Sequence, residues 1–124
     1  MVISIETLSE MVASWAATEP VVEKAYLFGS RVRGDNRHDS DLDVAIEITT
    51  RRGDSGSLAT WIAEAAQLRC SISLRIPFAV DLQWYGGPIE TPVVHAGLIV
   101  GSRIVYERPA QQGAAGDAPQ AARP

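Results

Sequence analysis

Two aspartates, Asp41 and Asp43, stand two residues apart at the head of an apolar segment that runs to Ile48. Apolar residues alternate with these acids, which predicts a strand with one face against a core and both carboxylates on the other face. Their Cα atoms would then lie about 7 Å apart. Carboxylates this close raise one another's pKa, and a divalent cation relieves the repulsion. Because Mg²⁺ prefers hard oxygen ligands and substrate phosphates, the pair predicts phosphoryl chemistry.

Asp81 repeats this arrangement in a second predicted strand, over residues 76–84, where it lies on the less apolar face. A third carboxylate would complete a site for two Mg²⁺ ions and accept the proton of an attacking hydroxyl. A single aspartate of this kind more often caps a loop or pairs with an arginine, but three in one pattern favour a metal site. An EF-hand calcium loop is excluded, since Val44 and Thr50 stand where it needs glycine and glutamate.

A Gly29-Ser30 pair precedes the aspartates by ten residues and ends a predicted strand over residues 21–28. Ser30 is expected to cap a short helical turn that runs to Arg33 and stops at a glycine. The first amides of such a turn attract phosphate, and we interpret Arg31 and Arg33 as further phosphate contacts. A plain strand-to-turn connection with two solvated arginines is the alternative.

The remaining pattern predicts the elements that must position these residues. Helical spacing indicates helices over 4–18, 57–70 and 92–101, and a short strand closes the pattern at 103–107. The helix over 57–70 is expected to bury an apolar stripe and its cysteine; these residues are Leu58, Trp61, Ile62, Ala65, Leu68 and Cys70. Together they predict an α/β (α+β) domain with a mixed central sheet of about four strands flanked by helices.

The composition bounds the domain and its surroundings. Residues 108–124 hold no large apolar side chain, so we expect a disordered tail after a folded domain over 1–107. A net charge of −4 argues against a long nucleic-acid partner. No apolar run reaches the length of a membrane span, no signal peptide is evident, and a lone cysteine suits a reducing compartment. We therefore expect a cytoplasmic protein without a membrane partner.

The spacing of the chemical residues resembles the signature of the nucleotidyltransferase superfamily, which includes DNA polymerase β and the aminoglycoside nucleotidyltransferases. That signature is Gly29-Ser30, ten residues, Asp41-x-Asp43, and a later strand aspartate, Asp81. The segments LFGSRVRG at 27–34 and SDLD at 40–43 are similar to the minimal nucleotidyltransferase branch. The resemblance spans roughly residues 20–107 and is strongest over 27–46.

The resemblance implies a mixed α/β fold that moves AMP from ATP to an acceptor hydroxyl and releases pyrophosphate. It implies that Gly29 and Ser30 hold the triphosphate, that Asp41 and Asp43 bind two Mg²⁺ ions, and that Asp81 is the third carboxylate of the site. Minimal members often act as antitoxins paired with a HEPN-domain ribonuclease, whose tyrosine hydroxyl takes the AMP. The expected function is thus a Mg²⁺-dependent protein adenylyltransferase in a hetero-oligomer with its toxin.

Two other functions stay open at this point. The chain could neutralise its partner by binding alone, although all motif positions are intact. It could also modify a small molecule such as an aminoglycoside, although the predicted ordered region leaves little chain for a separate acceptor pocket.

Overall fold

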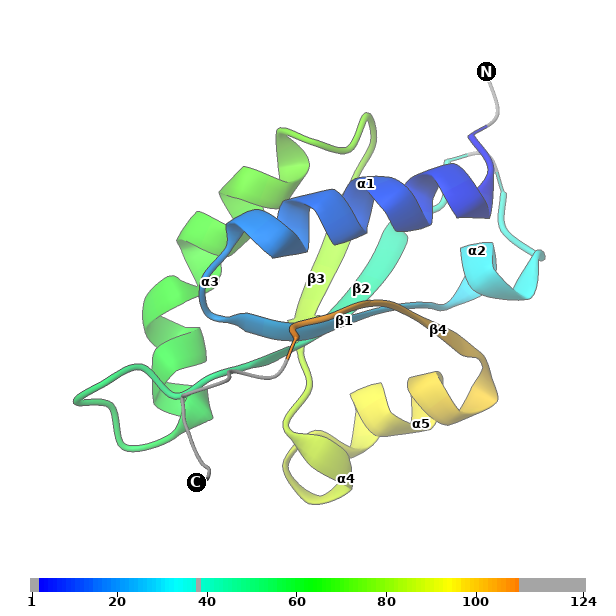
Figure 1. Cartoon of the computed structure of the whole chain (residues 1–124). Helices are drawn as coiled ribbons and strands as arrows, with labels where there is room; N and C mark the ends of the chain where they lie inside the picture. Colours follow the sequence, from blue (N-terminus) through cyan, green and yellow to red (C-terminus); the bar gives the residue numbers. More distant parts are fainter. Residues whose placement is uncertain (1–2, 38, 110–124) are drawn as a thin grey trace.

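The computed structural model describes residues 3–37 and 39–109 of the chain (Figure 1). The elements in chain order are α1 (Ile5–Thr18), β1 (Val22–Phe28), α2 (Ser30–Arg33), β2 (Leu42–Ile48), α3 (Ser57–Ser73), β3 (Val80–Trp84), α4 (Gly87–Glu90), α5 (Pro92–Val100) and β4 (Ser102–Glu107). Ser4 caps α1 by accepting from the Thr7 amide, as predicted. No helix among the described residues has the length and hydropathy needed to cross a membrane.

The strands form one mixed sheet in the order β3-β2-β1-β4. β1 runs antiparallel to both β2 and β4, whereas β2 and β3 run parallel and are joined by the crossover helix α3. The predicted fold class, a mixed sheet of four strands flanked by helices, is therefore confirmed.

One face of the sheet is covered by α1 and α3 (Figure 1). Leu42, Val44 and Ile46 of β2 point into this layer and are fully buried, which confirms the predicted alternation. Trp15 of α1 also lies in this core, and its Nε1 donates to Ser71 Oγ of α3 at 2.6 Å. The two helices are thus joined to each other as well as to the sheet.

The opposite face is covered in part by α5 (Figure 1). Phe28, Ala45, Val94 and Leu98 form a small buried cluster between this helix and the middle of the sheet. Ala45 belongs to the strand face predicted to point away from the core, yet it is fully buried. The second face therefore has its own apolar layer, and the carboxylates lie beside it.

The orientation predicted for α3 is wrong in part. Its buried residues are Thr60, Leu68 and Ile72, whereas Leu58 is 43% and Ile62 is 70% exposed. Thr60 is held inward because its hydroxyl donates to Asp54 Oδ2 and accepts from a backbone amide of the preceding loop. This anchor turns the start of the helix so that Leu58 and Ile62 face outward.

Other boundaries also differ from the prediction. Cys70 is exposed, because the buried face of α3 passes through Leu68 and Ile72. β3 begins at Val80, after a proline-containing approach, and not at residue 76. The short helix α4, capped by Gly86, lies between β3 and α5 and was not predicted.

The chain after β4 keeps contact with β1. The Arg108 amide donates to Glu23 O at 2.8 Å, and its guanidinium donates to the carbonyl oxygens of Val22 and Glu19. The composition predicts a disordered tail from residue 108. Arg108 instead donates hydrogen bonds to carbonyl groups at and just before the start of β1. Residues 110–124, where the rest of that tail is predicted, lie outside the described residues.

Candidate active site

Asp43 and Asp81 are direct neighbours across the parallel β2–β3 pair. Paired residues on adjacent strands share a sheet face and lie about 4.8 Å apart along the hydrogen-bonding direction. Asp43 is half-buried, and Asp81 is exposed. The third acid, Asp41, is exposed directly before β2 begins. The fold therefore brings together carboxylates that are about forty residues apart in the sequence.

Asp43 shows the electrostatic consequence of this grouping. Its pKa is raised above the ordinary value of 3.8, first by burial and then by the negative charges of Asp81 and Asp41. The guanidinium of Arg33 acts in the opposite direction and lowers the pKa of Asp43. Both other predicted carboxylates thus act on Asp43 in the folded chain, which is the condition that a bound cation would relieve.

Gly29 leaves room for the Asp43 side chain beside the start of α2. Phe28 pairs with Asp43 across β1 and β2, so the next residue, Gly29, passes directly over the Asp43 side chain. A Cβ placed on Gly29 would overlap Asp43 Oδ2 and approach Asp43 Cγ to 2.9 Å. Its φ of 80° and ψ of −161° also belong to a region that is essentially restricted to glycine. Glycine at this position therefore lets the carboxylate contact the start of α2.

The short helix α2 has the predicted extent but a different cap. Gly29 occupies the N-cap position, and its carbonyl accepts from the Val32 and Arg33 amides at 3.1 Å. Ser30 is thus the first helical residue and not the cap, because only glycine adopts the backbone angles that the cap needs here. Gly34, with a φ of 84°, ends the helix as predicted.

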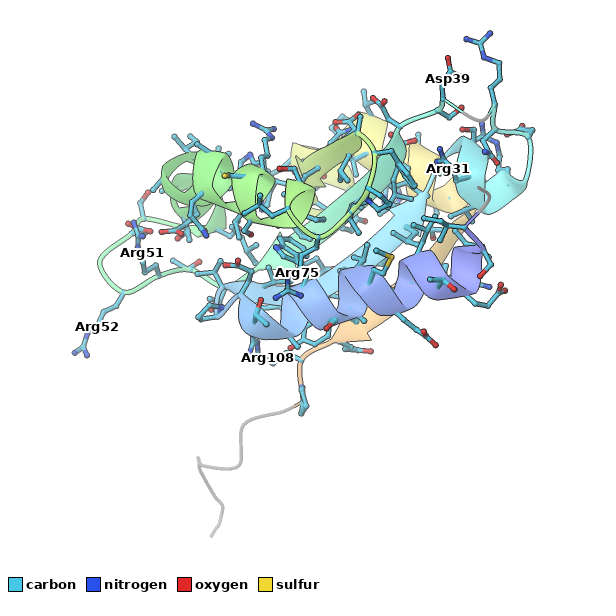
Figure 2. All side chains as sticks on the ribbon, turned by 90° about the horizontal axis from the view of Figure 1, so that it is seen from above. Arg31, Asp39, Arg51, Arg52, Arg75 and Arg108 are labelled. Atoms are coloured by element: carbon cyan, nitrogen blue, oxygen red, sulfur yellow. The ribbon has the colours of Figure 1, made fainter. Side chains whose placement is uncertain are left out.

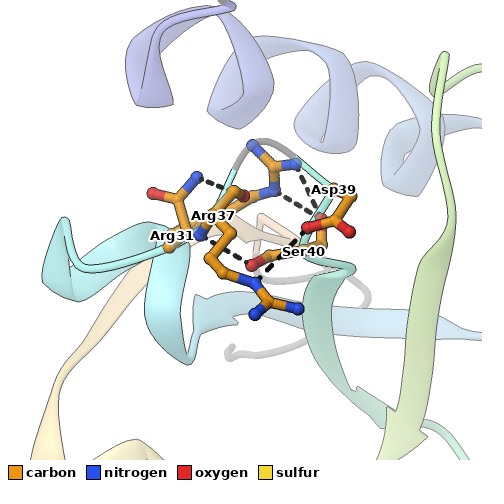
Figure 3. Close-up of polar contacts among 5 residues, drawn as sticks. Arg31, Arg37, Asp39 and Ser40 are labelled. Atoms are coloured by element: carbon orange, nitrogen blue, oxygen red, sulfur yellow. Dashed lines mark hydrogen bonds and ion pairs between the residues drawn. The ribbon is translucent and has the colours of Figure 1, made fainter.

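Arg31 connects three segments that carry the candidate site. Its Nε and Nη2 donate to Ser40 O at 3.0 and 2.7 Å, immediately before Asp41 (Figure 3). Its guanidinium carbon also lies 4.2 Å from the centre of the Phe78 ring, on the approach to β3. These contacts give Arg31 a bracing role between α2, β2 and β3. The phosphate contact predicted for Arg31 stays a prediction.

Arg33 lies differently from Arg31. It is exposed and forms an ion pair with Asp35 at 3.3 Å, while its charge still acts on Asp43. Arg51 and Arg52 lie far from this region, at the opposite end of the molecule from Arg31 (Figure 2). Both arginines were predicted as phosphate contacts. Arg31 braces the loop through Ser40, whereas Arg33 does not contact Ser40 among the described hydrogen bonds and acts on Asp43 through its charge.

Gln83 is a residue of the site that the sequence reasoning did not single out. Its Nε2 donates to Asp81 Oδ2 at 3.2 Å, from the same face of β3. The signal was present in the sequence, because residues two apart on a strand share a face. An uncharged side chain on an edge strand, however, has no chemistry that marks it without its neighbour.

The carboxylates of the site are oxygen donors that suit a hard cation such as Mg²⁺. Within residues 3–37 and 39–109, no three carboxylate, imidazole or thiol side chains converge closely enough to hold a metal as they stand. Mg²⁺ usually needs only one or two carboxylates and completes its shell with water and substrate phosphates. The adjacent pair Asp43 and Asp81 meets that requirement, and burial followed by the charge of Asp81 raises the pKa of Asp43.

Comparison with known families places the chain. The family described as "Polymerase beta, Nucleotidyltransferase" matches residues 10–108, which include every predicted site residue. The chain belongs to this nucleotidyltransferase family. No curated protein matches it.

Two solved structures are similar to this nucleotidyltransferase. One is titled "Crystal structure of the toxin-antitoxin with AMP-PNP"; it is 16% identical, with a TM-score of 0.54, over 81% of this chain and 73% of that chain. The other is a putative nucleotidyltransferase from Sulfolobus solfataricus, 22% identical, with a TM-score of 0.46, over 82% of this chain and 78% of that chain. At 16% identity, the first likeness shows a shared fold.

Proposed function

We propose that this nucleotidyltransferase moves AMP from ATP to a tyrosine hydroxyl of a HEPN-domain toxin and so acts as its antitoxin. The observation that carries the proposal is the register pair Asp43–Asp81 beside Gly29, where burial and then the charge of Asp81 raise the pKa of Asp43. The family match supports nucleotidyl transfer. The toxin–antitoxin structure with AMP-PNP supports a nucleotide and a protein partner, since it shares the fold.

In this proposal Asp41, Asp43 and Asp81 hold Mg²⁺. When bound, Mg²⁺ would neutralise negative charge on the phosphates and on the acceptor oxygen. Asp81, the most accessible of the strand carboxylates, accepts the proton of the acceptor hydroxyl. The acceptor oxygen forms a bond to the α-phosphorus, and the bond from that phosphorus to the β-phosphate oxygen breaks. Pyrophosphate leaves with the electron pair of that bond.

The phosphate side of the site is formed by Gly29, Ser30 and Arg33. The first N–H groups of a helix have no partner inside it, so the Ser30 amide is a donor for a phosphate oxygen. Arg33 adds positive charge close to Asp43. Because Gly29 passes over Asp43, these donors and the metal-binding carboxylates can act on the same triphosphate.

The test is transfer of label from ATP to a protein. The purified chain is incubated with Mg²⁺, ATP labelled at the α-phosphate, and the HEPN-domain protein encoded in the neighbouring reading frame. We expect label on a tyrosine of that protein, and we expect Asp43→Asn to abolish it. Asp39→Asn is the matched control, since Asp39 continues the alternation Asp39-x-Asp41-x-Asp43 but pairs with Arg37 in the loop (Figure 3).

Three results would contradict parts of the proposal. Label that persists in Asp43→Asn would exclude the proposed site. Toxin neutralisation in cells by Asp43→Asn would show that the antitoxin acts by contact and not by transfer. A neighbouring reading frame without the Arg-x₄₋₆-His pattern of HEPN ribonucleases would remove the proposed partner.

A further inference from the structure

The edge of the sheet at β3 is lined by a cleft, and the Leu82 carbonyl of this edge accepts from Arg69 Nη2 of α3 at 3.3 Å. β3 ends the strand order, with β2 as its neighbour on the inner side. On its outer side a cleft of about 380 Å³ runs between α3 and the start of α5. Its walls are largely apolar or aromatic and include Leu58, Trp61, Trp84 and Val93. Figure 1 shows why it is open, since α3 and α5 lie on opposite faces of the sheet.

Exposed apolar side chains surround this cleft. Val93 is 83% exposed in its wall, and Ile89 is 92% exposed next to the lining residue Glu90. Ile62 is 70% exposed and lies one helical turn from Leu58, on the same face of α3. Large apolar side chains gathered around a concave edge are typical of surfaces that bind another protein.

Gln83 connects the cleft to the carboxylates. It lines the cleft, and its side-chain amide donates to Asp81 Oδ2 at 3.2 Å. The cleft therefore leads to the carboxylate that takes the acceptor proton in the proposed reaction. Gly29, which follows β1, lies against Asp43 from the other side. The nucleotide side and the cleft thus flank the carboxylates from opposite directions across the sheet.

The cleft also contains an unsatisfied polar group. Trp84 is 8% exposed, and its Nε1 is buried without a hydrogen-bond partner among the described residues. A buried donor of this kind is unusual in a folded chain and normally finds an acceptor.

We propose that the cleft binds an extended, apolar segment of the partner protein and delivers its acceptor hydroxyl to Asp81. The inference rests on the proposed function, because the cleft is assigned to the acceptor segment through the role of Asp81 as the group that takes the acceptor proton. An extended segment matches a cleft that follows the edge strand β3, and apolar side chains match Leu58, Ile62 and Val93. The hydroxyl enters past Gln83, while ATP occupies the side of Gly29.

The first experiment measures AMP transfer by edge variants. Val93→Glu places a charge in the cleft wall, and Ile62→Glu places one beside the cleft on α3. Ile104→Glu places one on β4, at the other edge of the same sheet, where Ile104 is 55% exposed. For the two cleft variants we expect the KM for the HEPN-domain protein to rise at least tenfold. The dissociation constant for ATP with Mg²⁺, measured by calorimetry, should stay within twofold of wild type. Ile104→Glu should transfer as wild type.

The second experiment detects the interface without relying on transfer. The photo-crosslinking amino acid p-benzoylphenylalanine replaces Val93 in one chain and Ile104 in another, and each is irradiated with the HEPN-domain protein. We expect a crosslink from position 93 and none from 104. Wild-type KM values in both Val93→Glu and Ile62→Glu, or crosslinking from position 104 alone, would overturn the proposal that the cleft binds the partner. A position-93 crosslink without any AMP transfer would overturn the proposed function and leave the cleft as the interface.

Discussion

The two faces of the sheet bury different kinds of residue, although they are built from alternate positions of the same strands. The face under α1 and α3 is apolar, and residues such as Leu27, Val44 and Leu82 are at most 1% exposed there. The face under α5 combines a small apolar cluster with ionisable groups, among them Asp43 and Asp81. The first face can therefore supply stability while the second supplies chemistry, with little overlap of residues.

The polar groups of the second face also differ among themselves. Tyr26 donates to Glu47, and burial followed by this hydrogen bond raises the pKa of Tyr26. Tyr85 OH and His95 Nδ1 are 2.7 Å apart. These groups satisfy one another, whereas Asp43 and Asp81 face each other with like charge. The carboxylate pair is thus the part of this face that a ligand would stabilise.

The strongest test of the difference between the faces is Asp43→Asn. We expect AMP transfer to fall about a thousandfold, which corresponds to about 4 kcal/mol of activation free energy. Thermal unfolding should show no loss of stability at pH 7, because the substitution removes repulsion and little packing. A Tm several degrees below that of wild type would show that Asp43 also stabilises the fold.

The converse test uses two adjacent residues of β3 that point to opposite faces. Leu82→Ala should lower the free energy of unfolding by about 2–5 kcal/mol, since Leu82 is 1% exposed. Asp81→Asn, one residue away, should leave the free energy of unfolding nearly unchanged and lower transfer strongly. Urea unfolding and labelled-ATP transfer measure the two quantities. Equal stability losses in both variants would contradict the separation of the faces.

The parts of this arrangement that were predictable depend on local pattern. The alternation over residues 41–48 places Asp43 opposite the core, and β2 shows that placement. The glycine at 34 predicted the end of α2 because the left-handed conformation favours glycine. Such signals need only neighbours in the sequence, which is why the fold class and the carboxylate grouping could be expected from it.

The parts that were not predictable depend on distant partners. The outward turn of Leu58 and Ile62 follows from the anchor between Thr60 and Asp54, which the apolar spacing of α3 does not reveal. The bracing role of Arg31 depends on Phe78, far along the chain. The phosphate contact of Arg31 rests on its charge and stays a prediction, whereas its contacts with Ser40 and Phe78 are visible only in the tertiary structure.

The contact between Gly29 and Asp43 offers a third test, smaller than the first two. Gly29→Ala should cost about 1–3 kcal/mol of stability through its backbone angles and should lower transfer at least tenfold, because Asp43 must move. Gly34→Ala is the control, since its φ is also positive but, apart from the adjoining residues, no atom of the described part of the chain lies within 4 Å of an added Cβ. We expect Gly34→Ala to lose about 1–2 kcal/mol and to keep its transfer rate once folded. Equal transfer by both variants would show that the contact with Asp43 is not used.

Arg31→Lys tests whether Arg31 positions the loop or contacts phosphate, and its expected effect on transfer is smaller still. Lysine keeps the charge but loses the planar fork that holds Ser40 O and the stacking on Phe78. If Arg31 positions the strand start, kcat should fall severalfold while the KM for ATP stays unchanged. Arg33→Lys is the comparison, since Arg33 has no contact with Ser40 among the described hydrogen bonds. A raised KM for ATP with unchanged kcat in Arg31→Lys would instead favour the phosphate contact.

The pH dependence of stability provides the finest test of the carboxylate pair. Because the pKa of Asp43 is raised in the folded chain, the folded chain binds that proton more tightly than the unfolded chain does. Wild type should therefore lose stability relative to Asp43→Asn as the pH rises from 3.8, the ordinary value, through the raised one. Below 3.8 both states are protonated, and this difference between the two curves should vanish. Mg²⁺ should also reduce it at pH 7, since the metal neutralises the repulsion; a difference independent of pH and Mg²⁺ would assign it to packing and not to charge.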